Sequence, residues 1–264
     1  MKILVFGDIV GRIGREAVKK TLPGLRELHQ PDLTIANAEN LAHGKGVTPD
    51  VLDEMSAAGI DLFTSGNHVW DRKEAFDLLT DPKYGDKLMR PANYPAGVPG
   101  EGAKFLSIAT KNVLVLNLMG RVFSKADYDD PFRAFDDLLR QFAPKRPSLV
   151  LVDLHAEATS EKNAFGWHAA GRAAAVWGTH THVPTRDQRI LPGGTAYISD
   201  VGMCGYADGV IGVEREPVLK HFLTQLPLQM ETPQSGEAVV NALILTVEGG
   251  KATAIETYQK YLTI

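Results

Sequence analysis

Residues 173–182 read AAAVWGTHTH, and this stretch decides the fold prediction. The apolar run before the glycine is typical of a buried strand. Two histidines, His180 and His182, follow at its end, two residues apart. Side chains at positions i and i+2 of an extended chain point to the same face, which suits chelation of a metal ion. The stretch therefore predicts a buried strand that ends in a metal-binding pair, although two histidines in isolation are also compatible with an ordinary polar strand end.

Four other apolar runs also end in side chains that can bind metal. These runs are KILVFG (2–7), LTIANA (33–38), DLFTSG (61–66) and SLVLVDL (148–154). The polar residues that follow them are Asp8, Glu39 with Asn40, Asn67 with His68, and His155. Ligands of open α/β sheets bind at the carboxyl ends of the strands, and neighbouring strands lie ~4.8 Å apart. Each residue alone could be a helix cap or a turn residue, but together they predict one metal site.

The size of this ligand set indicates how many ions bind. Seven residues carry suitable oxygen or nitrogen atoms: Asp8, Glu39, Asn40, Asn67, His155, His180 and His182. Seven ligands are too many for one tetrahedral zinc and suit two ions that share a bridging carboxylate. The single cysteine excludes a thiolate cluster, and imidazole with carboxylate ligands suits Mn, Fe or Zn. We therefore predict two divalent metal ions per chain.

The order of the predicted elements indicates an α/β fold. Strands and helices alternate at the start of the chain, whereas residues 104–120 and 238–261 each predict two adjacent antiparallel strands. One mixed sheet, or two sheets between helices, would accommodate both patterns. The helix over 15–29 is expected to be interrupted near Pro23, and residues 81–102 are expected to form a long surface connection. We find no repeat or linker, so we predict a single domain over residues 1–264.

Composition narrows the class of partner. The chain is 44% hydrophobic and 23% charged, with a formal net charge of −4. A protein that binds long nucleic acid or an anionic membrane surface usually carries a basic excess, which is missing here. No stretch approaches the roughly 18 apolar residues of a membrane span, and the first residues enter a strand pattern without a signal peptide. We expect a cytoplasmic protein with a small-molecule substrate; a homo-oligomer stays open.

Taken in order, these motifs resemble those of the calcineurin-like metallophosphoesterase superfamily. GD (7–8), EN (39–40), GNH (66–68), His155 and GTHTH (178–182) correspond to its GDxH, GDxxD, GNHE or GNHD, lone His and GHxH motifs. The resemblance spans nearly the whole chain and implies a four-layer αββα sandwich, in which two mixed β-sheets are flanked by helices.

The departures from the superfamily pattern are also informative. Val10 stands where GDxH has its histidine, AEN replaces GDxxD, and Val69 replaces the acid that follows GNH. These departures resemble a bacterial branch of 2′,3′-cyclic-nucleotide phosphodiesterase-like proteins, some of which use iron. The segments AENLAHGKGVT (38–48), DLHAEATSEK (153–162) and SDVGMCG (199–205) are also similar to that branch.

The resemblance assigns roles to individual residues. It implies that Asp8, Glu39, Asn40 and His182 hold one metal. It also implies that Glu39, Asn67, His155 and His180 hold the other, with Fe or Mn as the ions and Zn as an alternative. His68 corresponds to the proton donor. The implied activity is hydrolysis of small phosphodiesters, above all 2′,3′-cyclic nucleotides and also 3′,5′-cyclic and aryl diesters, by a metal-bound hydroxide.

Substrate contacts are harder to assign. Arg121 could steady a phosphate oxygen, Tyr206 could stack on a base, and His43 could line the mouth of the site; a surface or packing role explains each equally well. Cys204 is expected in a glycine-bounded loop at the same rim. It has no histidine partner in sequence that would make it a nucleophile.

Three other functions are compatible with parts of the sequence. GDIVGRIG (7–14) suggests a dinucleotide site, but its glycines are spaced GxxxGxxG rather than GxGxxG. A mononuclear metal-dependent amidohydrolase could use an HxH pair, although there the pair usually comes early in a barrel. A regulatory or RNA-associated protein could retain a metal site with weak turnover, although the chain has no basic stripe.

Overall fold

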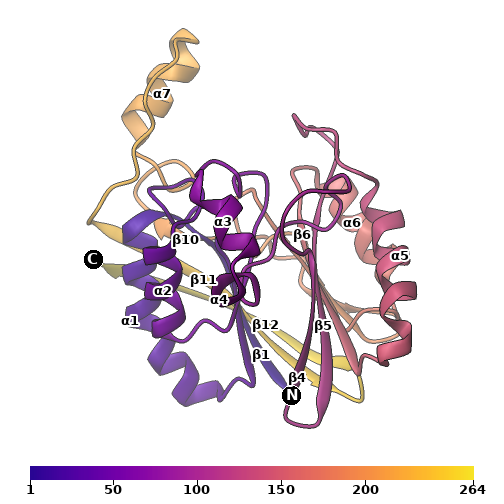
Figure 1. Cartoon of the computed structure of the whole chain (residues 1–264). Helices are drawn as coiled ribbons and strands as arrows, with labels where there is room; N and C mark the ends of the chain where they lie inside the picture. The colour runs from indigo at the N-terminus through magenta and orange to yellow at the C-terminus, as the bar shows by residue number, and fades with distance from the viewer.

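The computed structural model describes all 264 residues. Two six-stranded sheets pack face to face, and helices cover their outer faces (Figure 1). The predicted four-layer αββα arrangement is therefore confirmed.

The first sheet has the strand order β12-β11-β10-β1-β2-β3. Its central strand, β1, runs parallel to β2 and β10 and antiparallel to β11, so the sheet is mixed. Its strands are β1 (Lys2–Ile9), β2 (Leu33–Asn37), β3 (Leu62–Thr64), β10 (Met203–Tyr206), β11 (Glu237–Glu248) and β12 (Lys251–Thr263).

The second sheet has the order β4-β5-β6-β7-β9-β8. The four inner strands are parallel, and an antiparallel strand closes each edge. Its strands are β4 (Ala103–Ile108), β5 (Lys111–Met119), β6 (Leu149–His155), β7 (Ala175–Thr179), β8 (Arg189–Leu191) and β9 (Thr195–Ile198).

The helices of the outer layers pack against one sheet or the other. In Figure 1, α1 and α2 lie against the first sheet, and α5 and α6 lie against the second. The helices are α1 (Gly11–His29), α2 (Pro49–Ala58), α3 (Glu74–Thr80), α4 (Pro82–Gly85), α5 (Pro131–Phe142), α6 (Thr159–Ala169) and α7 (Arg215–Thr224), with a 3₁₀ turn at Ala143–Lys145.

Strand β1 shows why the strands of the two inner layers are apolar at every position rather than at every second position. Leu4 and Phe6 face the helix layer, where they belong to the core under α1 and α2. Ile3 and Val5 face the other way, into the core between the two sheets. Because successive side chains of a strand point to opposite faces, a strand in an inner layer must be apolar on both.

Two local expectations were wrong. Helix α1 continues through Pro23 without interruption, because the side chains on either side of it, such as Leu22 and Leu25, are buried against the sheet. The segment with Cys204 is strand β10, in the centre of the first sheet, rather than a rim loop. The connection that was expected over 81–102 is present between α3 and β4, and it includes the short helix α4.

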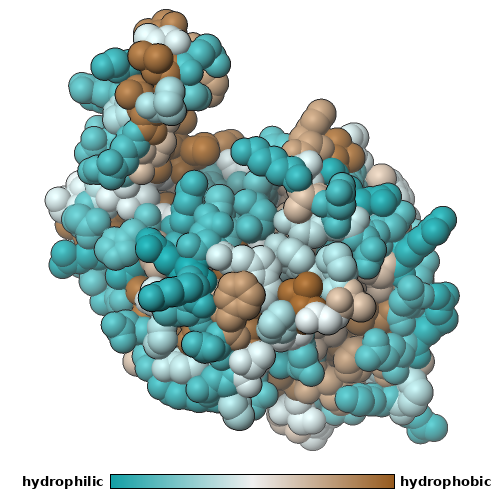
Figure 2. All heavy atoms as spheres, turned by 45° about the horizontal axis from the view of Figure 1, so that its top comes forward, coloured by the Kyte–Doolittle hydropathy of each residue, from teal (hydrophilic) through white to brown (hydrophobic).

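Helix α7 extends away from the two sheets (Figure 1). Only Val218 of this helix is buried, and Leu219, Phe222 and Leu223 are exposed. Figure 2 shows these apolar residues along the projecting segment. None of the helices combines the length and apolar character that a membrane crossing requires.

Candidate metal centre

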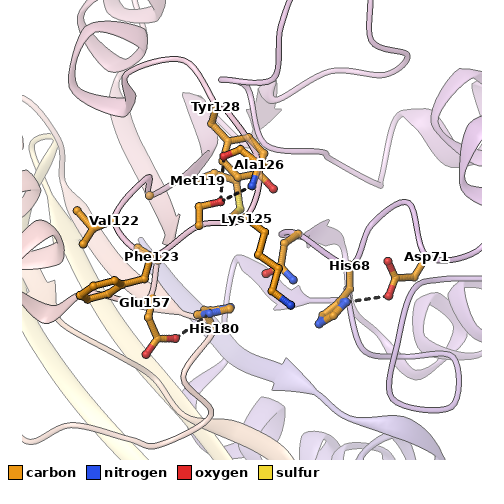
Figure 3. A pocket seen from close by; sticks show the side chains of 14 residues that line it. His68, Asp71, Met119, Val122, Phe123, Lys125, Ala126, Tyr128, Glu157 and His180 are labelled. Carbon is orange, nitrogen blue, oxygen red and sulfur yellow. Dashed lines mark hydrogen bonds and ion pairs between the residues drawn. The ribbon is translucent and has the colours of Figure 1, made fainter. Parts of the chain in front are cut away.

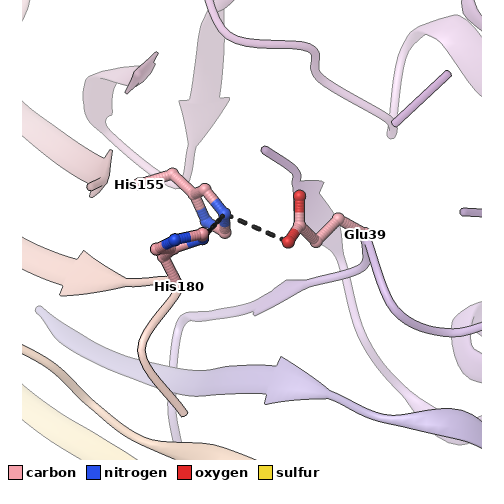
Figure 4. Close-up of side chains that lie close together, drawn as sticks. All are labelled: Glu39, His155 and His180. Carbon is pink, nitrogen blue, oxygen red and sulfur yellow. Dashed lines mark hydrogen bonds and ion pairs between the residues drawn. The ribbon is translucent and has the colours of Figure 1, made fainter. Parts of the chain in front are cut away.

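Three predicted ligands form a compact group at the ends of β2, β6 and β7 (Figure 4). One ligand atom each from Glu39, His155 and His180 lie within 4.8 Å of one another. His155 Nε2 is 3.0 Å from Glu39 Oε1 and 3.0 Å from His180 Nδ1. Lone pairs that converge in this way can coordinate one cation between them.

Three further predicted ligands surround this group. The amide oxygen of Asn67 lies 3.3 Å from His155 Nε2. Asp8 Oδ1 lies 3.9 Å from His155 Nδ1 and 3.9 Å from His182 Nε2. The fold therefore brings six of the seven predicted ligands together across both sheets. The seventh, Asn40, is buried directly after Glu39 in the chain.

Two buried oxygen atoms test whether this site fits a metal. Asp8 Oδ1 and Asn40 Oδ1 are both buried and have no hydrogen-bond partner. The amide nitrogen of Asn40 donates to the carbonyl of Gly44 at 2.8 Å, so its oxygen faces the other way. A buried acceptor without a partner costs about 1–3 kcal/mol or more, and a cation removes this cost. The donor set therefore fits divalent metal ions.

Each histidine has one ring nitrogen occupied by a second-layer partner. His155 Nδ1 contacts Thr179 Oγ1 at 2.9 Å, and that hydroxyl donates onward to Asp153 at 2.7 Å. His180 Nε2 contacts Glu157 at 2.9 Å. His182 Nδ1 donates to the carbonyl of Ile211 at 2.8 Å.

These partners select the tautomer of each ring. Metal-binding histidines usually donate their other N–H in this manner, which fixes the ring orientation. The remaining nitrogens, Nε2 of His155, Nδ1 of His180 and Nε2 of His182, are then free to act as ligands.

Burial and neighbouring charges shift the pKa values of Glu39, His155 and His180. Burial alone would raise the pKa of Glu39, but the adjacent His155 outweighs this effect and lowers that pKa to about 2. Burial alone would lower the pKa of His155, but Glu39 raises it to about 9. Burial, and next the charge of His155, lower the pKa of His180 to about 3. The ionised form of Glu39 is therefore favoured by the positive charge beside it, and a metal ion would favour it in the same way.

Close backbone approach makes the group possible. A Cβ atom on Gly66 would lie 2.2 Å from a ring carbon of His155 and 2.5 Å from Glu39 Oε2. Only glycine fits at this position of the GNH motif. His180 and His182 adopt φ angles of 100° and 65°, which are unfavourable for residues with a side chain and are typical of functional sites.

A buried ion pair supports the loop that carries these two histidines. Lys162 of α6 binds Asp200 at 2.7 Å and the carbonyl of Thr179 at 3.0 Å. Asp200 also accepts the backbone N–H groups of Thr181 and Gly202. Both charged side chains are about 1% exposed, so the pair is part of the interior and connects α6 with the GTHTH segment.

His68 and a cavity lie beside the metal ligands. The cavity measures about 450 Å³ and is lined by His68, Asn67, His180 and residues of the segment between β5 and α5 (Figure 3). The backbone N–H of His68 donates to Glu39 at 2.9 Å. Its ring Nδ1 contacts Asp71 at 2.8 Å. His68 is therefore positioned next to the metal ligands but faces the cavity.

The predicted substrate contacts lie outside this cavity. The guanidinium of Arg121 binds Asp130 at 3.0 Å on the surface. His43 lies exposed in the turn after β2, and Tyr206 packs against the core under α1. The structure does not bring these three residues to the cavity.

Three charged residues of the cavity were missed from sequence, as were its apolar residues. Asp71 follows His68 at a spacing of three, and Glu157 follows His155 at a spacing of two, so their positions near known motifs were available signals. Lys125 lies in a polar loop without a motif, and no signal singled it out.

Comparisons with known proteins identify the family of this chain. The family model for YmdB-like proteins matches residues 4–258. The chain is 45% identical over 256 residues to a 2′,3′-cyclic-nucleotide 2′-phosphodiesterase of Bacillus subtilis, covering 97% of this chain and 95% of that protein.

Solved structures show the same fold. A protein described as a novel phosphatase from Mycoplasma pneumoniae superposes with a TM-score of 0.92 at 32% identity, covering 99% of this chain and 93% of that one. A putative 5′-nucleotidase from Staphylococcus aureus has a TM-score of 0.58 at 13% identity, covering all of this chain and 54% of that one, which supports the fold alone. The chain therefore belongs to the YmdB-like family and has the fold of the calcineurin-like metallophosphoesterases, as its motif order predicts.

Proposed function

We propose that this protein is a metal-dependent phosphodiesterase that hydrolyses small phosphodiesters, and that 2′,3′-cyclic nucleotides are its main substrates. The observation that carries the proposal is the convergence of Glu39, His155 and His180 beside a cavity that contains His68. The name of the Bacillus subtilis relative supports the same substrate class.

Two metal ions share the ligand set in this proposal. Asp8, Glu39, Asn40 and His182 hold one ion, and Glu39, Asn67, His155 and His180 hold the other. We expect Fe or Mn, with Zn as an alternative. When bound, such ions neutralise the phosphate oxygens and lower the pKa of a coordinated water.

His68 supplies the proton that the leaving group needs. Its Nδ1 is held by Asp71 at 2.8 Å, which orients the ring and leaves Nε2 free to face the cavity. A protonated His68 can then donate from Nε2 to the departing alkoxide, a step worth typically 10²–10⁴-fold in rate. Strained cyclic and aryl diesters need less of this assistance.

Metal-loaded protein tests the proposal directly. Elemental analysis should give two divalent ions per chain, and the loaded protein should hydrolyse 2′,3′-cyclic AMP and bis-p-nitrophenyl phosphate. Protein that contains both metals but hydrolyses no diester would contradict the proposal. One ion per chain together with amidase activity would instead favour a mononuclear amidohydrolase. The two-sheet sandwich already argues against that class, because its members use a barrel.

Replacing His68 separates its role from metal binding. His68→Ala should lower kcat on an alkyl diester with a poor leaving group by about 10²–10⁴-fold, and much less on bis-p-nitrophenyl phosphate. Metal content should be unchanged, because His68 is not in the proposed ligand set. An equal loss on both substrates would remove His68 from the role of proton donor.

A further inference from the structure

The segment between β5 and α5, residues 120–130, forms one wall of the cavity beside the metal ligands. We call it the β5–α5 loop. Half of the residues that line the cavity come from it, including Val122, Phe123, Lys125 and Tyr128. Figure 3 shows Lys125 between His180 and His68, and Phe123 and Val122 on the far side of His180, near Glu157. A substrate bound at the metal ligands would therefore also contact the loop.

Both ends of the loop are held in place. At its start, the N–H groups of Arg121 and Val122 donate to the buried carboxylate of Glu161 at 2.9 and 3.1 Å. Asn93 connects the two ends: it donates to the carbonyl of Asp129 near the end of the loop and accepts the N–H of Met119, which directly precedes the loop, at 2.8 Å each. The central residues are thus presented over the cavity by a fixed frame, which lowers the entropic cost of binding a ligand there.

Lys125 is the one lysine or arginine that lines the cavity. It forms no ion pair or side-chain hydrogen bond, although two carboxylates line the same cavity. Asp71 is engaged with His68 and Glu157 with His180. In Figure 3 the amine of Lys125 points into the space between those histidines. This ammonium group is therefore available to an external anion next to the metal ligands.

Phe123 presents an exposed aromatic face at the edge of the same cavity. Its side chain is 84% exposed, and its backbone adopts a φ of 64°, which is uncommon for a bulky residue. Figure 3 shows the ring beside Val122 and Glu157. An exposed ring on a strained backbone gains nothing from core packing, so its position is better explained by a ligand that covers it.

We propose that the β5–α5 loop recognises a nucleotide through two contacts: Lys125 binds a non-bridging phosphate oxygen, and Phe123 stacks on the nucleobase. This inference rests on the proposed phosphodiesterase function and specifies which residues select the substrate. The cavity of about 450 Å³ has the size of a small-molecule site. Base stacking on an aromatic side chain tolerates different bases, so the loop selects nucleotides without selecting one base.

The phosphate contact is tested with Lys125→Met. On metal-loaded protein, kcat/KM for 2′,3′-cyclic AMP should fall about tenfold or more, and its dependence on ionic strength should weaken, because one charge that attracts the anion is lost. Lys125→Arg should recover part of the loss. Lys111→Met, at the opposite end of β5, is the matched control and should behave like the wild type. A kcat/KM of Lys125→Met within twofold of wild type would overturn the phosphate contact.

The base contact is tested with Phe123→Ala on two substrates. KM for 2′,3′-cyclic AMP should rise about tenfold, while KM for the base-free 1-O-methylribose 2,3-cyclic phosphate should stay within twofold. Phe222→Ala, an exposed phenylalanine on α7, is the matched control. Equal changes on both substrates, or no change on either, would overturn the base contact. Because Lys125 and Phe123 are exposed, both variants should melt at the wild-type temperature.

Calorimetric binding of adenosine 3′-monophosphate separates this inference from the proposed function. The wild type should bind it more tightly than ribose 3-phosphate, and both loop variants should bind it more weakly than the wild type. If the nucleotide binds through the loop but no diester is hydrolysed, the proposed function fails and the loop assignment stands. If diesters are hydrolysed but adenosine 3′-monophosphate binds no better than ribose 3-phosphate, the loop assignment fails alone.

Discussion

Glu157 shows how one side chain behind a ligand can set the properties of the site. It contacts the Nε2 atom of His180 at 2.9 Å, so the Nδ1 atom of that ring faces Glu39 and His155. The sequence indicates His180 as a ligand, but it does not indicate which ring nitrogen binds. That choice depends on a partner 23 residues away in the chain, which only the fold brings close.

Removing Glu157 should therefore weaken metal binding. Glu157→Ala leaves the His180 ring without its hydrogen-bond acceptor, and such losses typically cost 10–100-fold in metal affinity. Titration of the metal-free protein with Mn²⁺, followed by calorimetry, measures the change. Glu157→Gln retains an acceptor oxygen and should lie closer to the wild type. Equal affinities for the alanine variant and the wild type would show that Glu157 does not orient the ring.

Two glycines of helix α1, Gly14 and Gly24, have different surroundings. Gly14 packs against the first sheet, where a Cβ atom would lie 2.2 Å from the carbonyl oxygen of Cys204. Gly24 lies on the exposed side, and a Cβ atom there would meet nothing within 4 Å. The two positions should therefore respond to alanine in opposite directions.

Alanine at these positions tests the packing of α1. Gly24→Ala should raise the free energy of unfolding by about 0.5–1 kcal/mol, because alanine loses less backbone entropy than glycine in a helix. Gly14→Ala should lower it by about 1–3 kcal/mol, since the strand must move to make room. Urea unfolding followed by circular dichroism measures both. Stabilisation by Gly14→Ala would contradict the close approach of α1 to β10.

The junction between α6 and the GTHTH segment depends on the buried Lys162–Asp200 pair. Lys162→Met leaves the Asp200 carboxylate buried without its charge partner, which should lower the free energy of unfolding by about 3–5 kcal/mol. The double variant Lys162→Met/Asp200→Asn removes both charges and should recover part of that loss. Thermal unfolding compares the three proteins. A double variant that is no more stable than Lys162→Met would show that the charge imbalance is not the cause.

At the scale of the whole molecule, the proposed metal ligands come from both sheets. Asp8 lies near the end of β1 and Glu39 follows β2, both in the first sheet. His155 ends β6, and His180 and His182 follow β7, both in the second sheet. An ion bound between them ties the sheets together, in addition to the apolar core that they already share. Metal binding should therefore stabilise the folded chain as one unit.

Chelation should lower the melting temperature without splitting the transition. Each metal ion at a hundred times its dissociation constant contributes about 2.7 kcal/mol, which for a chain of this length corresponds to roughly 5–10 °C per bound ion. Calorimetry in EDTA and in excess Mn²⁺ should show a single transition in each case, as expected for one domain. Two separate transitions, or identical melting temperatures, would contradict this expectation.

The sheet order was less predictable than the elements themselves. The long apolar runs of β1, β6 and β11 identify these strands, because their pattern is local. The four-residue strand β10 follows Gly202, contains Gly205 and shows no periodicity, so the sequence does not place it beside β1. The pairing of β1 with β11 joins positions more than 200 residues apart. No local pattern in the sequence predicts such a contact.

The sequence by itself determined the α/β class and the polar strand-end side chains that are proposed as metal ligands. Both follow from local patterns, namely apolar runs and the polar residues that end them. Only the tertiary structure decided which ring nitrogens face the site, that Arg121 turns away from the cavity, and that Lys125 enters it. The physical reason is that these choices depend on hydrogen bonds, ion pairs and packing between residues that are distant in the chain.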